Sequence, residues 1–277
     1  MSAAAVPPSS PSSPSSSSTS AAPLVDVAHD AYGVSGVVRL TLNRPDAFNA
    51  LSEALIDALQ AQLAAVAQSD ARVVVIAAAG RAFCAGHDLR EMRAAPSLDY
   101  YKRLFARCSK MMLAIQSMPQ PVIARVQGVA TAAGCQLVAM CDLAVAAESA
   151  RFAVSGINLG LFCSTPAVPL TRNVSRKAAF EMLMTGEFID AQKALREGLV
   201  NRVVAAEELD DAVAALAASI CAKPREAVAA GKGLFYRQLE MGVEAAYQLA
   251  GQTMACNMMT DPALDGVQAF IDKRPGK

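Results

Sequence analysis

Two patterns of hydrophobic and polar positions follow each other along the chain from about Leu24 onward. Short apolar runs at Val37–Leu42 and Val73–Ala77 predict buried strands. Between these runs the apolar positions recur at helical spacing, and Ser52 before them is a good helix N-cap. The helical stripe consists of Leu55, Leu59, Leu63 and Val66. The pattern therefore predicts a strand, a helix and a second strand.

The same alternation continues toward the C-terminus. Helical patterns cover Asp99–Gln116 and Ala132–Met140, and apolar runs predict strands at Pro121–Val126, Leu143–Ala146 and Leu199–Val204. Apart from the last of these strands, the chain from Pro166 onward is mostly helical in pattern. Strands that alternate with helices indicate an α/β fold with crossover connections. The late helices indicate a covering layer or an oligomerisation arm rather than a second core.

The composition excludes several classes of function. The chain has 277 residues with 25 Lys and Arg against 25 Asp and Glu, so its net charge is zero. This balance gives no electrostatic footprint for nucleic acid or for an anionic membrane. No segment reaches the roughly 18–20 consecutive apolar residues of a membrane span. The seven cysteines form no C-x-x-C pair and there are only two histidines, so the sequence predicts no metal site.

Residues 1–23 differ from the rest of the chain. They contain ten Ser, five Pro and no charged residue, a composition that predicts a disordered tail. The segment has no basic region before an apolar one, which speaks against a secretory signal, and no Arg, which makes it a poor mitochondrial presequence. We therefore expect a cytoplasmic protein, or a mitochondrial one if the source is a eukaryote.

Three segments carry the candidate chemistry, and each follows the end of a predicted strand. They are Arg44–Leu51, Ala82–Leu89 and Gln127–Leu137. Ligands of open α/β folds usually bind at this edge of the sheet. A single loop of small residues before a helix is a weak signal, because it is commonly just a tight turn.

In this order and spacing, the three segments closely resemble the crotonase superfamily of enoyl-CoA hydratases and isomerases. Cys141–Ala144 and Ala269–Arg274 agree with the family pattern, and Ala132–Gln136 with Gly160–Pro166 resembles one branch of it. The resemblance implies an α/β crotonase spiral of repeated ββα units with a helical C-terminal region. Residues 24–205 would form the core and residues 206–277 a helical trimerisation region. The assembly would be a homotrimer, or a hexamer made of two trimers.

The resemblance also implies an oxyanion hole made of two backbone N–H groups. By motif position these belong to His87 and to Ala133, where the family usually has Gly. Two fixed donors stabilise the negative charge that grows on a thioester oxygen, and a helix N-terminus beside Ala133 adds a favourable dipole. Ala133 would need φ and ψ values that a β-carbon accepts. The imidazole of His87 could serve as a base, although most single histidines in loops do not.

Both catalytic glutamates of the family's hydratases are replaced. The first position is Gln136, and aligning Arg151–Gly160 with the family pattern puts Gly156 at the second. An amide positions water but cannot take its proton at neutral pH. Since one acid or base typically contributes about 10²–10⁴-fold, ordinary hydration is not expected. Restoring both carboxylates should recover hydration unless Gly156 has a conformation that no side chain can adopt.

Other residues could replace the missing pair. Asp88 and Glu91 are candidates, but Asp88 more naturally caps a helix, with Glu91 on its solvated face. Cys163 as a nucleophile would need a base, so a small side chain lining the acyl pocket is the simpler role, shared with Ser164 and Thr165. Phe162 could fill space meant for a longer acyl chain, and the resemblance makes Asp142 structural.

Coenzyme A would bind as part of an acyl-CoA or enoyl-CoA substrate, and no separate cofactor is implied. The family's contacts fall on the backbone near Asp46, Ala47 and Phe48 and on the segment Ala85, Gly86, His87, Asp88 and Leu89. Lys273 and Arg274 could contact phosphates, including those of a ligand in a neighbouring subunit. A solvated basic tail is an equally good interpretation of these two residues.

Two hypotheses remain from the sequence. The first is an acyl-CoA enzyme that stabilises a thioester enolate, as a hydratase, an isomerase or a thioester-cleaving enzyme. The second is a non-catalytic or nearly inactive acyl-CoA-binding homo-oligomer, which the replacements at Gln136 and Gly156 favour. A Rossmann dehydrogenase is excluded because no G-x-G-x-x-G follows the first strand.

Overall fold

A six-stranded sheet forms the centre of the molecule in the computed structural model, which describes residues 22–273. Its strands, in spatial order, are β1 (Val25–Ala28), β2 (Val37–Leu42), β3 (Val73–Ala78), β5 (Val122–Val126), β7 (Leu143–Ala147) and β10 (Arg202–Val204). Only β1 runs antiparallel to its neighbour. All residues of β3 are buried, as expected for a central strand covered on both faces.

A smaller sheet lies beyond the carboxyl ends of these strands. It contains β4 (Ala82–Cys84), β6 (Val129–Thr131), β8 (Arg151–Ala153) and β9 (Ile189–Asp190). The chain passes from β3 to β4, from β5 to β6 and from β7 to β8, and a helical segment follows each pair. The predicted spiral of ββα units is thereby confirmed. Strands of two or three residues are too short to show a periodicity, so the sequence did not predict this second sheet.

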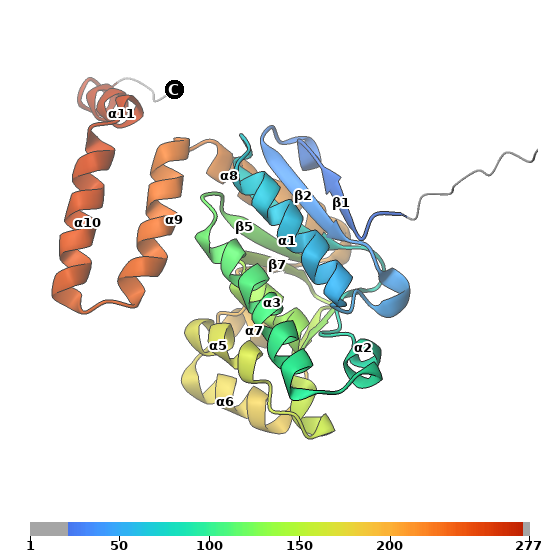
Figure 1. Cartoon of the computed structure of the whole chain (residues 1–277). Helices are drawn as coiled ribbons and strands as arrows, with labels where there is room; N and C mark the ends of the chain where they lie inside the picture. Colours follow the sequence, from blue (N-terminus) through green and yellow to red (C-terminus); the bar gives the residue numbers. More distant parts are fainter. Residues whose placement is uncertain (1–21, 274–277) are drawn as a thin grey trace, which may run out of the picture.

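Helices cover both faces of the large sheet. On one face lie α1 (Glu53–Ala67) and α3 (Leu98–Ser117), which pack on each other, and on the other lies α8 (Leu209–Cys221) (Figure 1). The smaller helices are α2 (Leu89–Ala94), α4 (Ala133–Met140), α5 (Ser164–Asn173), α6 (Arg176–Thr185) and α7 (Ala191–Arg196), with 3₁₀ turns η1 (Ala31–Gly33), η2 (Pro45–Ala47), η3 (Ser155–Leu159) and η4 (Ala206–Glu208). Ser52 caps α1, since its Oγ accepts a hydrogen bond from the Leu55 N–H at 3.2 Å.

The last three helices form an arm that stands away from the core (Figure 1). They are α9 (Arg225–Leu239), α10 (Val243–Met258) and α11 (Asp261–Ile271), and no residue of α10 or α11 is buried. Large apolar side chains are exposed there, including Tyr247 at 77% and Phe270 at 85%. The predicted boundary between a core of residues 24–205 and a helical region of residues 206–277 stays a prediction. Within the second of these regions, α8 packs on the large sheet, and only α9, α10 and α11 stand apart from it.

A buried lysine fastens the arm to the core. The Nζ of Lys232 on α9 donates to the Asp142 carboxylate at 2.7 Å and to the carbonyls of Ile115 and Gln120, both at 2.8 Å. The carboxylate also accepts from the Tyr236 hydroxyl at 2.6 Å and from the Val122 N–H at 2.6 Å. Asp142 therefore has the structural role that the family resemblance implied: it joins α9 to the start of β5, while Lys232 joins α9 to the end of α3.

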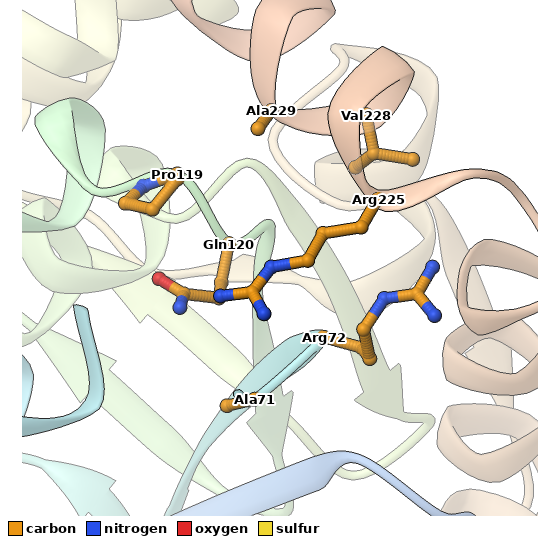
Figure 2. Close-up of a pocket in the computed structure, with 7 residues that line it drawn as sticks. All are labelled: Ala71, Arg72, Pro119, Gln120, Arg225, Val228 and Ala229. Atoms are coloured by element: carbon orange, nitrogen blue, oxygen red, sulfur yellow. The ribbon is translucent and has the colours of Figure 1, made fainter. Parts of the chain in front are cut away.

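Two arginines that line a small pocket with Gln120, Arg72 and Arg225, add further contacts between the arm and the core (Figure 2 shows the pocket). Arg225 donates to Asp70 at 3.0 Å and to the Ser69 carbonyl at 2.7 Å, and Arg72 donates to the Lys223 carbonyl. The pocket lined by Arg72, Gln120 and Arg225 has a volume of about 10 Å³. That is room for about one water molecule, so this pocket is a packing defect rather than a ligand site.

Removing the buried lysine should destabilise the protein. Lys232→Met leaves the Asp142 carboxylate without its cation and two carbonyls without a donor, which should cost about 3–5 kcal/mol in the free energy of unfolding. Urea denaturation followed by circular dichroism measures the loss. Arg172→Met is the matched control, because its ion pair with Glu240, the residue that follows α9, is exposed and should be worth less than about 1 kcal/mol. Equal losses for the two variants would contradict this account.

Candidate active site

The three segments singled out in the sequence meet in the structure. The Ala85 N–H donates to the Phe48 carbonyl at 3.1 Å, and the Leu51 N–H donates to the Gly86 carbonyl at 2.7 Å. A β-carbon at Gly86, which has φ of +94°, would lie 3.0 Å from the Ala132 β-carbon and 3.4 Å from the Ala133 nitrogen. The loops that precede α1, α2 and α4 therefore touch one another at one edge of the sheet.

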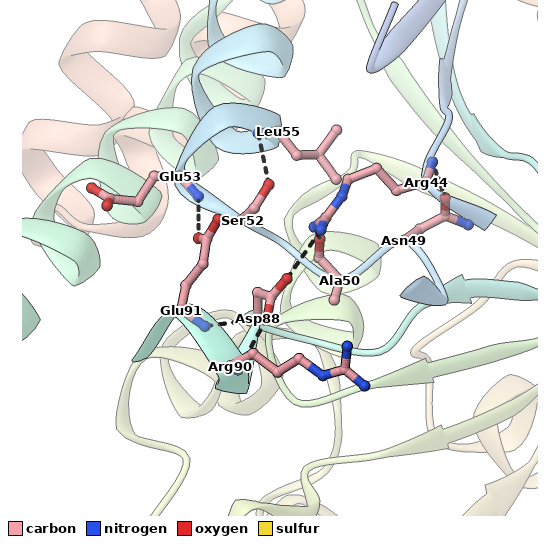
Figure 3. A network of polar contacts seen from close by, with 9 residues as sticks. All are labelled: Arg44, Asn49, Ala50, Ser52, Glu53, Leu55, Asp88, Arg90 and Glu91. Carbon is pink, nitrogen blue, oxygen red and sulfur yellow. Dashed lines mark hydrogen bonds and ion pairs between the residues drawn. The ribbon is translucent and has the colours of Figure 1, made fainter. Parts of the chain in front are cut away.

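A polar network holds the first two loops together (Figure 3). Arg44 donates to the Ala50 carbonyl at 2.6 Å and to the Asp88 carboxylate at 3.1 Å. Asn49 is buried and donates to the carbonyls of Ala79 and Ala82 at 2.8 and 2.9 Å. These contacts fix the loop Arg44–Leu51 against the loop that carries His87.

Asp88 and Glu91 have structural partners. Asp88 is the N-cap of α2, and its carboxylate accepts from the Arg90 N–H at 3.0 Å. Burial alone would raise the pKa of Asp88, but the hydrogen bonds from Arg44 and from the first turn of α2 lower it. Glu91 is half-buried and has a partner besides solvent. Its carboxylate accepts the Glu53 N–H at 2.9 Å, because the free N-terminal donors of α1 face it.

The two backbone N–H groups predicted for the oxyanion hole are both free. Leu51 pairs with His87 in a parallel bridge whose hydrogen bonds run through Gly86 and Asp88, so the N–H of His87 points the other way. Ala133 is the first residue of α4, where no carbonyl stands four residues earlier in the helix. Within residues 22–273 neither N–H donates a hydrogen bond. Two unpartnered donors thus lie on touching loops.

The strained residue of this turn is Ala132, not Ala133. Ala132 has φ of 50° and ψ of −119°, whereas Ala133 is already helical. The Ala132 N–H donates to the Ala153 carbonyl at 2.9 Å, and the Gln136 N–H donates to the Ala132 carbonyl at 3.0 Å. These bonds on both sides hold a side-chain-bearing residue in a conformation that favours glycine.

The position expected for the second glutamate has no room for a side chain. A β-carbon at Gly156 would lie 2.6 Å from the Leu161 carbonyl oxygen and 2.8 Å from the Cys163 Sγ. The Gly156 N–H also donates to this sulfur at 3.3 Å. Burial raises the pKa of the Cys163 thiol, so it stays protonated at neutral pH. Cys163 therefore fills the space beside Gly156, and nothing in its surroundings makes it a nucleophile.

Two side chains at the junction have no polar partner. Gln136 is buried at 4% exposure, and neither its Oε1 nor its amide nitrogen makes a hydrogen bond within the described residues. His87 is half-buried, with its ring edge against Phe105 at 5.4 Å between centroids. Burial lowers the pKa of this imidazole to about 4, so it is neutral at physiological pH.

The remaining predicted contacts lie in different places. Asp46 and Ala47 end η2 and Phe48 follows it, with the Arg81 guanidinium 4.6 Å from the Phe48 ring centre. Phe162 and Ser164 are exposed, and Leu89 begins α2. Lys273 comes two residues after α11, a helix that stands away from α1 and α2 (Figure 1), and Arg274 lies outside the described residues.

Two kinds of site are absent from the described residues, a metal-binding cluster and a membrane-spanning helix. Across residues 22–273 no group of three or more His, Cys, Asp or Glu side chains could hold a metal ion. No helix in the same range is long and apolar enough to cross a bilayer.

Known proteins share both the sequence and the fold. Residues 33–277 match the family described as enoyl-CoA hydratase/isomerase. The rat protein called enoyl-CoA hydratase domain-containing protein 3, mitochondrial, is 46% identical over 240 residues, which span 86% of this chain and 80% of the rat protein. This relative confirms the branch of the family that Ala132–Gln136 and Gly160–Pro166 resemble.

Two crystal structures extend the comparison. An enoyl-CoA hydratase from Mycobacterium smegmatis has 63% identity and a TM-score of 0.90, covering 92% of this chain and 99% of its own. Human enoyl-CoA hydratase domain-containing protein 3 has 42% identity and a TM-score of 0.87, with the same coverage of 92% and 99%. The α/β crotonase fold is confirmed by both.

Glycine at two neighbouring positions should have opposite effects on stability. Ala132→Gly removes a strained β-carbon and should raise the free energy of unfolding by about 1 kcal/mol. Ala133→Gly places glycine in a helix and should lower it by about 0.5–1 kcal/mol. Guanidinium denaturation of both variants measures the difference. A loss of stability in Ala132→Gly would show that Ala132 carries no strain.

Alanine should be tolerated poorly at Gly156. Its β-carbon meets a backbone carbonyl and a sulfur, so Gly156→Ala should cost about 1–3 kcal/mol of stability. Gly251→Ala in α10, where a β-carbon meets nothing within 4 Å, is the matched control and should be neutral or stabilising. A glutamate at position 156 would fare no better, so Gly156→Glu with Gln136→Glu should not restore hydration. A stable double variant that hydrates crotonyl-CoA would refute the steric block.

Proposed function

The chain belongs to the enoyl-CoA hydratase/isomerase family, and on this basis we propose that it binds acyl-CoA or enoyl-CoA thioesters and stabilises their enolate form. The supporting observation is the pair of unpartnered N–H groups of His87 and Ala133 on touching loops. Both would donate to the thioester oxygen of a bound substrate.

These donors act through electrostatics. When the α-carbon loses a proton, or the β-carbon gains a nucleophile, negative charge grows on the thioester oxygen. Donors that are already fixed in place stabilise this charge without reorganising, and one such donor is typically worth roughly 10²–10³-fold in rate. Ala133 begins α4, so the positive end of the helix dipole faces the same oxygen.

Proton transfer is the weak part of the proposed reaction. Gln136 cannot accept a proton from water at neutral pH, and Gly156 offers no side chain. Asp88 and Glu91 are engaged by Arg44 and by the Glu53 N–H, which argues against either as the replacement. Ordinary hydratase activity on enoyl-CoA is therefore proposed to be very weak. An isomerase or thioester-cleaving reaction would need a proton acceptor other than these residues.

The alternative function is a non-catalytic or nearly inactive acyl-CoA-binding homo-oligomer. The neutral replacements at both glutamate positions favour it, whereas the free donors favour an enzyme because a pure binder has less need of them. In either case coenzyme A would contact Asp46, Ala47 and Phe48 and the backbone from Ala85 to Leu89. Lys273 would reach a ligand only in another subunit.

We extend the proposal to assembly and location. The exposed apolar side chains of α10 and α11 support a trimer or a hexamer, because surfaces of this kind are normally covered by a partner. The location is proposed to be cytoplasmic, or mitochondrial in a eukaryote, as the name of the rat relative suggests for that protein.

Deletion of one donor tests the proposed function. In heavy water the protein should exchange the α-protons of butyryl-CoA faster than the uncatalysed reaction by at least roughly 10²-fold, while hydration of crotonyl-CoA stays slow. Proline is tolerated at the first position of a helix and has no N–H. Ala133→Pro in an Ala132→Gly background should therefore return exchange to near the background rate, as measured by NMR.

The Ala132→Gly parent, which keeps both donors, is the control, and a thermal melt checks that each variant is folded. Binding of the thioester without any exchange by the unmodified protein would support the non-catalytic alternative. Absence of binding in calorimetry, with acetyl-, butyryl- and crotonyl-CoA at millimolar concentration, would reject both functions.

A further inference from the structure

A small pocket lies between α6, β9 and α7, apart from the candidate active site. Its volume is about 170 Å³, well below the roughly 300–1,000 Å³ of pockets that hold drug-sized ligands. β9 is an edge strand of the small sheet, and α6 and α7 precede and follow it in the chain. The lining runs from Glu181 to Arg196 and shares no residue with the three loops of the candidate site. A ligand of this pocket is therefore small and does not compete with an acyl-CoA thioester.

The charged side chains of the lining are only partly paired with one another. Glu181 and Lys193 form an ion pair, with 3.0 Å between the carboxylate oxygen and Nζ. Asp190 caps α7, since its carboxylate accepts the N–H of Lys193 at 2.6 Å. The side chains of Glu187 and Arg196 make no hydrogen bond or ion pair with any residue that the structure describes. The pocket thus presents one free carboxylate and one free guanidinium.

The end of α6 adds negative charge beside Glu187. The helix ends at Thr185, and Gly186 caps it by donating its N–H to the Met182 carbonyl at 3.0 Å. The last carbonyls of a helix carry partial negative charge, so this end of α6 attracts a cation. Arg196 is the last residue of α7, and its guanidinium is a planar set of donors that suits a carboxylate. The pocket therefore has a place for a cation and a place for a carboxylate.

Apolar side chains complete the lining. Met182 and Ile189 are 2% and 5% exposed, and Phe188 beside Ile189 is 54% exposed. These side chains would bury the hydrocarbon part of a ligand. A simple anion would leave Glu187 without a partner, and a simple amine would leave Arg196 without one. A small zwitterion with an apolar side chain satisfies both charges and covers the apolar surface.

We propose that this pocket binds a free α-amino acid with a short apolar side chain. The ammonium group contacts Glu187 and the end of α6, and the carboxylate is bound by Arg196. The side chain of the ligand packs on Met182, Ile189 and Phe188. This site goes beyond the proposed function, because its ligand contains no thioester and touches none of the loops that would bind one.

Calorimetry with three molecules of similar shape tests the assignment. L-Valine carries both charges, isovalerate lacks the ammonium group, and isobutylamine lacks the carboxylate. The unmodified protein should bind L-valine at least roughly tenfold more tightly than either of the other two. Arg196→Gln removes the partner of the carboxylate, so it should abolish the preference for L-valine over isobutylamine. Glu187→Gln should abolish the preference over isovalerate for the corresponding reason.

Arg176→Gln is the matched control. Arg176 is an exposed arginine at the other end of α6 and does not line the pocket. Its replacement should leave the affinity for L-valine unchanged. A thermal melt checks that each variant is folded, and binding of butyryl-CoA should be the same in all of them.

The measured affinities decide between this site and a solvated patch of charges. Equal affinity of the unmodified protein for the three molecules would overturn the assignment, as would an equal loss of L-valine binding in Arg176→Gln and Arg196→Gln. Binding of butyryl-CoA without any binding of L-valine at millimolar concentration would overturn this site and leave the proposed function intact. Binding of L-valine without any binding of butyryl-CoA would support the site and count against the proposed function.

Discussion

The close approach of α4 to β4 is the constraint on which the candidate site depends. A β-carbon at Gly134 would lie 2.0 Å from the Cys84 carbonyl oxygen and 2.9 Å from the Cys84 β-carbon, so no other residue fits between the helix and the strand. This contact brings the first turn of α4 against the loop that leaves β4. The free N–H of Ala133 lies beside Gly86 for that reason, and the conformation of Ala132 follows from the same tight entry into the helix.

The sequence predicted those parts of the fold whose signal is local and long enough to be read. The runs at Val37–Leu42 and Val73–Ala77 and the helix behind Ser52 appear within one residue of their predicted bounds. The strands of the small sheet were missed because an alternation of two or three residues is not distinguishable from chance. The arm was predicted from helical periodicity, but its separation from the core depends on packing that no local pattern encodes.

In the candidate site, too, features with a local sequence signal were predicted, and features that depend on tertiary packing were not. Motif spacing identified the loops of His87 and Ala133, and the structure brings them into contact. By contrast, Cys163 fills the space beside Gly156 only because the intervening turn folds back, and Lys232 finds Asp142 across 90 residues of sequence. A lysine in an otherwise ordinary amphipathic helix carries no sign that it will be buried. Of the two positions where the family resemblance implies glutamates, one holds the amide Gln136 and the other holds Gly156, packed against Cys163.

The arm has a consequence for how the protein reaches its final state. Helices α10 and α11 bury no residue in the single chain, while α9 is held through Lys232 and its neighbours. α10 packs against α9, but neither α10 nor α11 has a buried residue, and helices with little buried surface are marginal in water, so these two gain much of their order from whatever covers them. If that cover is another copy of the chain, the order of the arm becomes a function of protein concentration, unlike that of the core. Dilution would then loosen the last two helices first, and proteolysis would begin there while the sheet remained intact.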